Sequence, residues 1–201
     1  MDVTRLGVMG GTFDPIHHGH LVAAQEAAST LGLDRVLFVP VWQPPHKADE
    51  PWASPDDRLC MVRLAVADNP RFEVSTIEIE RTGLSYTVDT LQRLTGIFPK
   101  ASLYFIVGMD SLAELPKWHE PAGILRLARI AALHRPGWQT VDLATLAREL
   151  PESAGRVELV EMPELDISSS ELRDRIQAGR PVRYLVPDAV AAYVAERGLY
   201  R

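Results

Sequence analysis

The 201-residue sequence has one cysteine, no long apolar run and no excess of basic residues. The single cysteine, Cys60, excludes an internal disulfide and a zinc site built from cysteines. No apolar run approaches the roughly 18 residues that a membrane-spanning helix needs. The polar start of the chain also lacks the pattern of a signal peptide. We therefore expect a cytoplasmic protein with no membrane partner.

Acidic residues outnumber basic ones, with 27 Asp and Glu against 21 Lys and Arg and a net charge of −6. Proteins that bind nucleic acid usually carry a basic excess or stripe, so we expect no nucleic-acid partner. Two common nucleotide-binding patterns, G-x-G-x-x-G and G-x-x-x-x-G-K-[ST], are also missing. An anionic ligand would then have to be held by a few local donors against the net charge.

Apolar runs typical of buried strands alternate with helical patterns along the chain, and 46% of the residues are apolar. The expected strands cover residues 6–10, 36–40, 72–79, 103–107, 130–133 and 157–160. Continuous apolar strands separated by helices predict a parallel sheet covered on both faces. We expect a doubly wound, Rossmann-like α/β fold with a mainly parallel sheet, in the order β-α-β-α-β-α-β-α-β-α-β-α-α. One domain would span residues 1–201, with a helical part from about residue 168.

Several helices have readable ends. Ser54, followed by proline and two aspartates, predicts the start of one helix, and Asp142 predicts another. Pro187 opens the last helical pattern, and Gly198 is expected to close it. The proline-rich stretch 42–55 is interpreted as a long loop and a candidate for a lid over a substrate.

The string GGTFDPIHHGH at residues 10–20 follows the first expected strand. Its two glycines let the backbone come close to a ligand, and the N–H groups of a helix starting near Gly19 suit a phosphate. His17 and His20 are three residues apart, so both imidazoles can face the same point. A plain turn with surface histidines is the first alternative. A zinc site with His18 as a further ligand is the second, although no cysteine or carboxylate at a familiar spacing completes it.

The string ISSSELR at residues 167–173 predicts a helix start near the end of the chain. Ser168 and Glu171 fit the S-x-x-E capping box, which by itself would be purely structural. The same helix start offers hydroxyl groups, with Arg173 one turn further along, and such a group of donors suits a triphosphate. From these residues alone, a helix cap and a phosphate site remain equally open.

These two motifs resemble those of a known enzyme family. Residues 17–20 match the H-x-G-H signature of the nucleotidylyltransferase superfamily. The longer string at residues 10–20 is similar to that of its nicotinate mononucleotide adenylyltransferase branch, and residues 167–173 resemble the motif I-S-S-T-x-x-R, with Ser170 in place of threonine. The resemblance implies that ATP donates an adenylyl group to nicotinate mononucleotide, with release of pyrophosphate.

The resemblance also implies an ATP site. A third element, G-x-D-x-L at residues 108–112, is similar to the family's ribose and adenine side, although Asp110 could equally be a helix N-cap. The implied ATP-binding residues are Gly10, Gly11, Thr12, Phe13, His17, Gly19, His20, Gly108, Asp110, Ser168, Ser169 and Arg173. Of these, His17, His20 and Arg173 would be catalytic, because they neutralise phosphate charge. Mg²⁺ is expected to arrive with ATP, without a metal site on the protein.

Four further segments resemble the family's acceptor site, namely SYTVDTL at residues 85–91, LPKWH at 115–119, PPHK at 44–47 and HRPG at 134–137. The implied mononucleotide-binding residues are Asp14, Lys47, Thr87, Trp118, His119 and Arg135. In the family, the tryptophan of such a segment stacks on the nicotinate ring. From the residues alone, Trp118 would be packing, Thr87 part of a helix start with hydroxyl caps, and Lys47 a solvated loop residue. Trp118 is also a candidate for part of the lid.

The sequence leaves three alternatives to this function. Another H-x-G-H adenylyltransferase, such as a pantetheine-phosphate enzyme, would share the phosphate motifs but would be shorter and lack the segment of Trp118. A nicotinamide acceptor differs from nicotinate by one amide, and the side chains do not separate the two. A nucleotide sensor without catalysis would be expected to have lost His17, His20 or Arg173, and all three are present. The sequence does not determine whether the protein is a monomer or a homo-oligomer.

Overall fold

The computed structural model describes residues 3–43, 53–81, 83–134 and 140–201. Within them one sheet contains the strands β1 Arg5–Gly11, β2 Arg35–Pro40, β3 Phe72–Val74, β4 Ser102–Gly108, β5 Ala128–His134 and β6 Val157–Glu161. Their order is β3-β2-β1-β4-β5-β6, and every neighbouring pair is parallel. The doubly wound, Rossmann-like fold that the alternating apolar runs predict is therefore confirmed.

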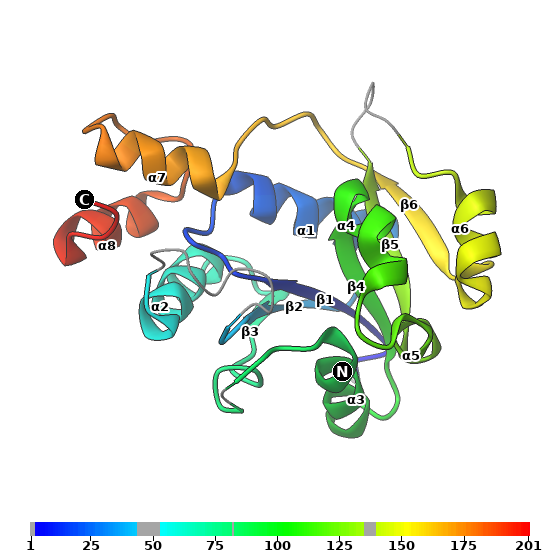
Figure 1. Cartoon of the computed structure of the whole chain (residues 1–201). Helices are drawn as coiled ribbons and strands as arrows, with labels where there is room; N and C mark the ends of the chain where they lie inside the picture. Colours follow the sequence, from blue (N-terminus) through cyan, green and yellow to red (C-terminus); the bar gives the residue numbers. More distant parts are fainter. Residues whose placement is uncertain (1–2, 44–52, 82, 135–139) are drawn as a thin grey trace.

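Helices cover both faces of this sheet. They are α1 His18–Thr30, α2 Pro55–Val66, α3 Thr87–Ile97, α4 Met109–Glu114, α5 Pro121–Leu127, α6 Leu143–Glu149, α7 Ser169–Gln177 and α8 Asp188–Arg197, with the 3₁₀ helices η1 Leu115–Lys117 and η2 Pro151–Ser153. Figure 1 shows α1 and α3 on opposite sides of the sheet, with α7 and α8 beyond the first turn of α1. No helix in the described ranges is long and apolar enough to cross a membrane.

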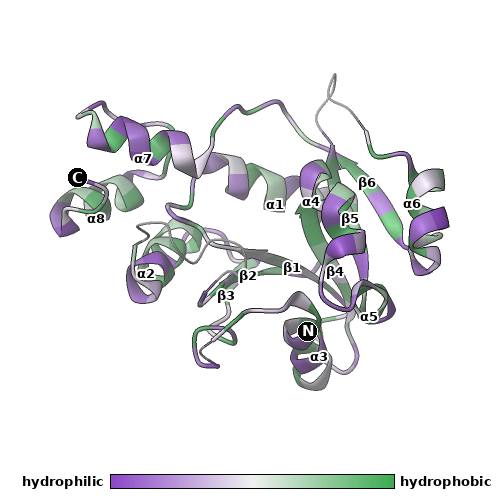
Figure 2. Ribbon diagram, viewed as in Figure 1, coloured by the Kyte–Doolittle hydropathy of each residue, from purple (hydrophilic) through white to green (hydrophobic). Residues whose placement is uncertain are grey.

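The two faces of the sheet have separate apolar cores, because successive residues of a strand point to opposite sides. In β2, Val36 and Phe38 belong to the core that α1, α2, α7 and α8 share. Leu37 and Val39 belong to the core on the other face, with side chains from α3 to α6. Figure 2 shows mainly hydrophobic colours along β1 and β4, whereas the helices are striped. Both faces of the sheet are covered by helices, which is why the strands appear in the sequence as continuous apolar runs.

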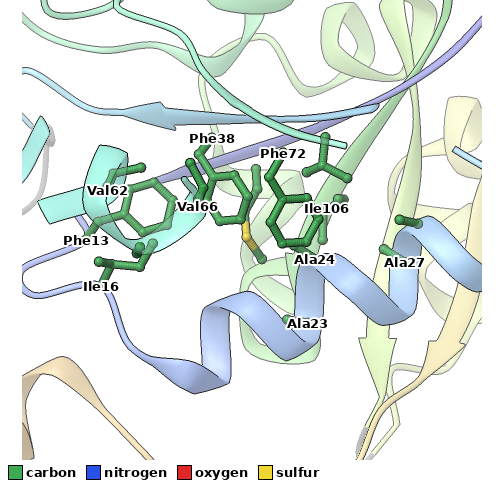
Figure 3. Packing of buried hydrophobic residues seen from close by; sticks show 14 of the residues in the cluster. Phe13, Ile16, Ala23, Ala24, Ala27, Phe38, Val62, Val66, Phe72 and Ile106 are labelled. Carbon is green, nitrogen blue, oxygen red and sulfur yellow. The ribbon is translucent and has the colours of Figure 1, made fainter. Parts of the chain in front are cut away.

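A row of aromatic rings in the first core fixes the loop after β1. Phe13, Phe38 and Phe72 follow one another between α1 and α2 (Figure 3), with ring centroids 5.8 and 5.2 Å apart. On the α1 side the row is faced by alanines such as Ala24, whose small side chains let the helix approach closely. The loop that carries the GGTFDPIH motif is thus anchored in the core by its own phenylalanine.

Most of the predicted helix ends are confirmed. The hydroxyl of Ser54 accepts a hydrogen bond from the backbone N–H of Asp57 at 3.1 Å, which caps α2. The carboxylate of Asp142 accepts one from Ala144 at 3.0 Å, which caps α6. Gly198 ends α8 with a φ of 63°, a left-handed conformation that favours glycine.

Two predicted elements differ from the structure. The strand predicted over residues 72–79 is wrong beyond Val74, because β3 pairs with β2 over three residues only and the chain then turns. The pattern itself gives the reason: the apolar residues Phe72 and Val74 have even numbers, whereas Ile77 and Ile79 have odd numbers. The single helix expected between β4 and β5 is in fact α4, η1 and α5 in succession.

Candidate active site

Two adjoining cavities open where β1 and β4 end, at the point where the strand order changes direction. Doubly wound folds bind their ligands at such a switch point. The larger cavity has a volume of about 1100 Å³ and the smaller one about 680 Å³. Gly10, Thr12, Phe105 and Trp118 border both. Molecules bound in the two cavities would therefore lie side by side.

His17 and His20 stand together at the start of α1, on the wall of the larger cavity. Their rings are stacked, with centroids 3.8 Å apart and planes 28° from parallel, as the spacing predicts. The backbone N–H of His17 donates to Nδ1 of His20 at 3.3 Å. In the neutral ring the proton is then on Nε2, which leaves Nε2–H as the donor. Burial, and to a lesser extent the neighbouring His17, holds the pKa of His20 well below its usual value.

Gly19 is required by the position of His17. A Cβ atom built on Gly19 would lie 2.9 Å from Nδ1 of His17 and 3.0 Å from its Cε1. Any larger residue would therefore displace the histidine ring, because real Cβ atoms do not approach other atoms so closely. The edge-on contact of Phe13 with His20, with centroids 5.1 Å apart, restrains the second ring. The two histidines and the glycine of the H-x-G-H pattern therefore pack together with Phe13 as one unit.

The helix start of α7 is fastened to the loop between β1 and α1. The hydroxyl of Ser169 donates to the carbonyl of Pro15 at 3.0 Å, and Nη1 of Arg173 donates to the carbonyl of Asp14 at 2.8 Å. Ser168 caps the helix by accepting from the N–H of Glu171 at 3.1 Å, as predicted. Ser168, Ser169 and Arg173 all border the larger cavity. The two motifs therefore meet in one site.

The remaining residues implied for ATP do not all border the larger cavity. Gly10, Thr12, Gly19, Gly108 and Asp110 border the larger cavity. Phe13 borders it too, but its ring is packed in the core. Gly11 borders only the smaller cavity. The N-cap of α4 is Gly108, so the alternative that Asp110 is the N-cap is wrong. Oδ1 of Asp110 lies over Gly108, where a Cβ atom would approach it to 2.5 Å.

The smaller cavity is bordered by three of the four described residues that are implied for the mononucleotide. Thr87, at the start of α3, borders it together with Trp118 and His119. Trp118 packs edge-on against Phe105 at 6.0 Å and still borders both cavities, so packing and ligand stacking are compatible there. His119 is exposed and lies against the ring of Tyr86, with centroids 4.4 Å apart. The N-cap of α3 is Tyr86 without a side-chain bond, so the expected hydroxyl cap is wrong.

Glu78 is a buried acid in the smaller cavity that the sequence analysis did not identify. It is 5% exposed, and its Oε1 accepts a hydrogen bond from the Thr90 hydroxyl at 2.6 Å. Its Oε2 is buried without a hydrogen-bond partner among the described residues. Burial raises the pKa of this carboxyl above its ordinary value. The sequence gives no signal for this burial, because the apolar residues on either side, Ile77 and Ile79, would put Glu78 on the polar side of an alternating pattern.

Asp14 borders the larger cavity rather than the smaller one, and its contacts lie within the protein. It is 1% exposed, and its Oδ1 accepts hydrogen bonds from the Tyr200 hydroxyl and from the N–H of Ala53. Burial is the main cause that raises the pKa of the Asp14 carboxyl, against the opposing effect of these bonds and of two arginines. Binding of the mononucleotide by this residue stays a prediction.

Arg58 is a second residue that the sequence analysis missed. It is 2% exposed, on the buried face of α2, and within the described residues its guanidinium donates to four backbone carbonyls. The acceptors are Thr12, Val41, Trp42 and Ala53, at 2.8 to 3.2 Å. It thereby joins the turn after β1 to the segments on either side of residues 44–52. Helical periodicity from the buried Met61 and Ala65 was the signal that placed it inside.

Some predicted features lie outside the described residues. Lys47 and Arg135 are among them, as is most of the predicted loop 42–55. Within the described ranges, no group of three or more His, Cys, Asp or Glu side chains is arranged to hold a metal ion.

A family model described as cytidylyltransferase-like matches residues 8–175. This match covers most of the chain and both phosphate motifs, so the chain belongs to the cytidylyltransferase-like family. It is 52% identical over 203 residues to a probable nicotinate-nucleotide adenylyltransferase of Roseiflexus sp. (strain RS-1), and 100% of each chain is covered. A protein of the same name from Herpetosiphon aurantiacus is 50% identical over 196 residues, with 98% of each chain covered. Within its class, the chain belongs to the nicotinate-nucleotide adenylyltransferases.

Solved structures show the same fold. The Plasmodium falciparum nicotinic acid mononucleotide adenylyltransferase, complexed with APC or with NaAD, has a TM-score of 0.79 to this chain. The sequences are 17% and 18% identical, and 98% of this chain and 97% of that chain are covered. The nucleotidylyltransferase fold expected from the motifs is confirmed by this likeness.

Proposed function

We propose that this protein transfers the adenylyl group of ATP to nicotinate mononucleotide, forming nicotinate adenine dinucleotide and pyrophosphate. The observation that carries the proposal is the pair of adjoining cavities at the switch point. One is bordered by His17, His20 and Arg173, and the other by Trp118 and the start of α3. The identity of about half to relatives named for this activity supports the choice of acceptor. The reaction belongs to NAD biosynthesis.

The chemistry needs positioned donors more than a base. The acceptor is a phosphate monoester with a second pKa near 6, so its oxygen is already anionic at pH 7. This oxygen attacks the α-phosphorus of ATP, and the bond from that phosphorus to the pyrophosphate oxygen breaks. The obstacle is the approach of one anion to another. Donors fixed in advance around the phosphates are therefore expected to supply most of the catalysis.

The larger cavity suits the triphosphate. His20 offers Nε2–H from a neutral ring, and we assign it with His17 to the α-phosphate and its bridging oxygens. Arg173 supplies a full positive charge beside the hydroxyls of Ser168 and Ser169, which suits the β- and γ-phosphates. The first turns of α1 and α7 add backbone N–H groups and the positive ends of two helix dipoles. These local donors would hold ATP against the net charge of −6.

Mg²⁺ is assigned to the substrate rather than to the protein. The described residues contain no cluster of three metal-ligating side chains. Mg²⁺ prefers oxygen ligands and retains water, so the phosphate oxygens of ATP are its natural partners here. When bound, the ion would neutralise phosphate charge. From the protein side, Arg173 would add a further positive charge, and the two histidines would donate hydrogen bonds.

The smaller cavity suits a pyridinium ring that carries a carboxylate. Thr87 and the first N–H groups of α3 border it, and a helix N-terminus favours a carboxylate over a neutral amide. Trp118 offers an aromatic face beside it. We therefore place nicotinate mononucleotide here, in reach of Trp118, His119 and Thr87, with Lys47 and Arg135 as further predicted contacts.

Pyrophosphate release tests the proposal. We would incubate the protein with ATP, Mg²⁺ and either nicotinate or nicotinamide mononucleotide, and we expect faster release with nicotinate. His20→Ala should fold and lose about 10²–10³ in turnover, as is typical when one such donor is removed. His18→Ala, beside it but outside both cavities, is the matched control. Release with pantetheine phosphate instead, or none at all with ATP still bound, would replace the proposed activity by another adenylyltransferase or by a sensor.

The cytoplasmic location expected from the sequence accompanies this proposal. Assembly into a homo-oligomer stays a prediction. Sedimentation of the purified chain would settle its oligomeric state directly.

A further inference from the structure

The last residues of the chain reach the loop that carries the phosphate motif. Tyr200 donates a hydrogen bond from its hydroxyl to Oδ1 of Asp14, which lies between β1 and α1. Tyr200 is half-buried and has a φ of 63°, a left-handed conformation that residues other than glycine rarely adopt. Such a conformation persists where the surroundings impose it, and it often marks a functional position. The contact with Asp14 is the visible constraint at this position.

Asp14 connects Tyr200 to Arg173. Nη1 of Arg173 donates to the carbonyl of Asp14 at 2.8 Å and lies 4.0 Å from Oδ2 of the same residue. The third contact of Asp14 is the N–H of Ala53, at 3.2 Å from Oδ1. The arginine implied for the triphosphate is therefore held by a residue whose own carboxylate is oriented by the C-terminal tyrosine.

The charges around Asp14 favour this arrangement. Two guanidinium groups, those of Arg173 and Arg58, face its carboxylate and lower the pKa that burial raises. Tyr200 stays protonated and a donor, because burial and the Asp14 charge raise the pKa of its hydroxyl far above the ordinary range. Oδ2 of Asp14 has no hydrogen-bond partner among the described residues, so it is left facing Arg173.

We infer that Tyr200 is a positioning residue for ATP binding, which acts by fixing Asp14 so that Arg173 points into the larger cavity. This inference rests on the proposed function, because Arg173 is the residue assigned to the triphosphate. Loss of the Tyr200 hydroxyl should weaken the binding of ATP selectively. The neighbouring cavity, which takes the mononucleotide, contains neither Asp14 nor Arg173 and should be unaffected.

Tyr193 provides a matched control. Its hydroxyl donates to Oδ1 of Asp57 at 2.8 Å and joins α8 to α2. It is also a tyrosine–aspartate bond near the end of the chain, and neither Tyr193 nor Asp57 borders either of the two cavities described above. Tyr193→Phe and Tyr200→Phe should therefore lower the unfolding temperature by comparable amounts. Only the second should change the behaviour toward ATP.

The experiment compares the two variants in the full-length chain. Titration calorimetry gives the dissociation constants of ATP and of nicotinate mononucleotide, and pyrophosphate release gives KM and kcat. For Tyr200→Phe we expect the Kd and KM for ATP to rise about tenfold, the effect of one hydrogen bond of about 1.4 kcal/mol. The mononucleotide Kd should stay unchanged. An ATP Kd equal to that of the wild type, or a rise matched by Tyr193→Phe, would overturn the inference. A wild-type protein that binds ATP without releasing pyrophosphate would overturn the proposed function instead.

Discussion

Among single residues, Gly19 shows how a small residue can determine the position of a neighbouring side chain. It is the second residue of α1, where alanine would normally favour the helix. The ring of His17 lies within 2.9 Å of the position that a Cβ atom would take. The requirement for glycine comes from this close approach and not from backbone conformation.

The variant Gly19→Ala should lose turnover while remaining folded. The added methyl group displaces His17, and we expect kcat to fall at least tenfold, since a misplaced donor loses much of its stabilising effect. Gly96→Ala, in α3, is the control because nothing lies within 4 Å of its Cβ position. It should gain roughly 0.5–1 kcal/mol in unfolding free energy with normal activity. Wild-type kcat in Gly19→Ala would show that His17 has no fixed role.

Glu78 allows a prediction about pH. Its folded-state pKa is raised above the ordinary 4.5. At a pH between the ordinary pKa and the raised pKa, Glu78 is protonated in the native state and ionised in the unfolded state. The contribution of Glu78 to the free energy of unfolding therefore falls as pH rises. The amide oxygen of Glu78→Gln can still accept the hydrogen bond from Thr90. Because the amide does not titrate, the variant does not lose stability in this way as pH rises. Urea unfolding at pH 4.5 and pH 7.5 should show the variant gaining on the wild type at the higher pH.

An exposed side chain provides the comparison for that measurement. Glu152→Gln changes the same chemical group on the surface. The raised pKa of Asp14 acts equally in the wild type and in both variants, so it cancels in the differences. A Glu78→Gln difference that is the same at both pH values would mean that folding does not raise the pKa of Glu78.

At the level of elements, α2 and α7 have the same kind of N-cap, but removal of the two caps should have different effects. Ser54 and Ser168 each accept a hydrogen bond from the N–H three residues on, at 3.1 Å. Replacing either by alanine should destabilise the protein by about 1 kcal/mol. Only Ser168→Ala should also raise the KM for ATP, because Ser168 borders the larger cavity and Ser54 does not. Thermal unfolding and pyrophosphate release on both variants make the comparison. Equal KM values would leave Ser168 with a structural role alone.

Element boundaries were predictable where the signal is local. The caps of α2, α6 and α7 involve atoms two or three residues apart, so short sequence patterns identify them. The end of β3 depends instead on how far β2 offers a partner, and that is decided by pairing across the sheet. Similarly, the turn between α4 and α5 follows from packing of Leu115 and Ile124 in the second core, which periodicity in so short a segment does not reveal.

For the whole molecule, the two cavities predict independent ligand effects on stability. A ligand that binds only the folded state, at 100 times its Kd, stabilises it by about 2.7 kcal/mol. For a chain of this size that corresponds to roughly 5–10 °C in unfolding temperature. Nicotinate mononucleotide and an ATP analogue with a methylene group as its α–β bridge should each give such a shift, and the two shifts should add. If saturating analogue abolished the mononucleotide shift, the ligands would share one cavity.

The sequence by itself determined the fold class, most helix ends and the residues of both phosphate motifs. These follow from apolar periodicity, from caps and from a resemblance that runs along the chain. The tertiary structure decided which of those residues meet. Asp14, Arg173 and Tyr200 converge because α7 and α8 pack on the face of the sheet that carries α1. Glu78 and Arg58 became buried through packing between distant segments. Local patterns report only on neighbours along the chain, whereas such contacts depend on how the finished layers fit together.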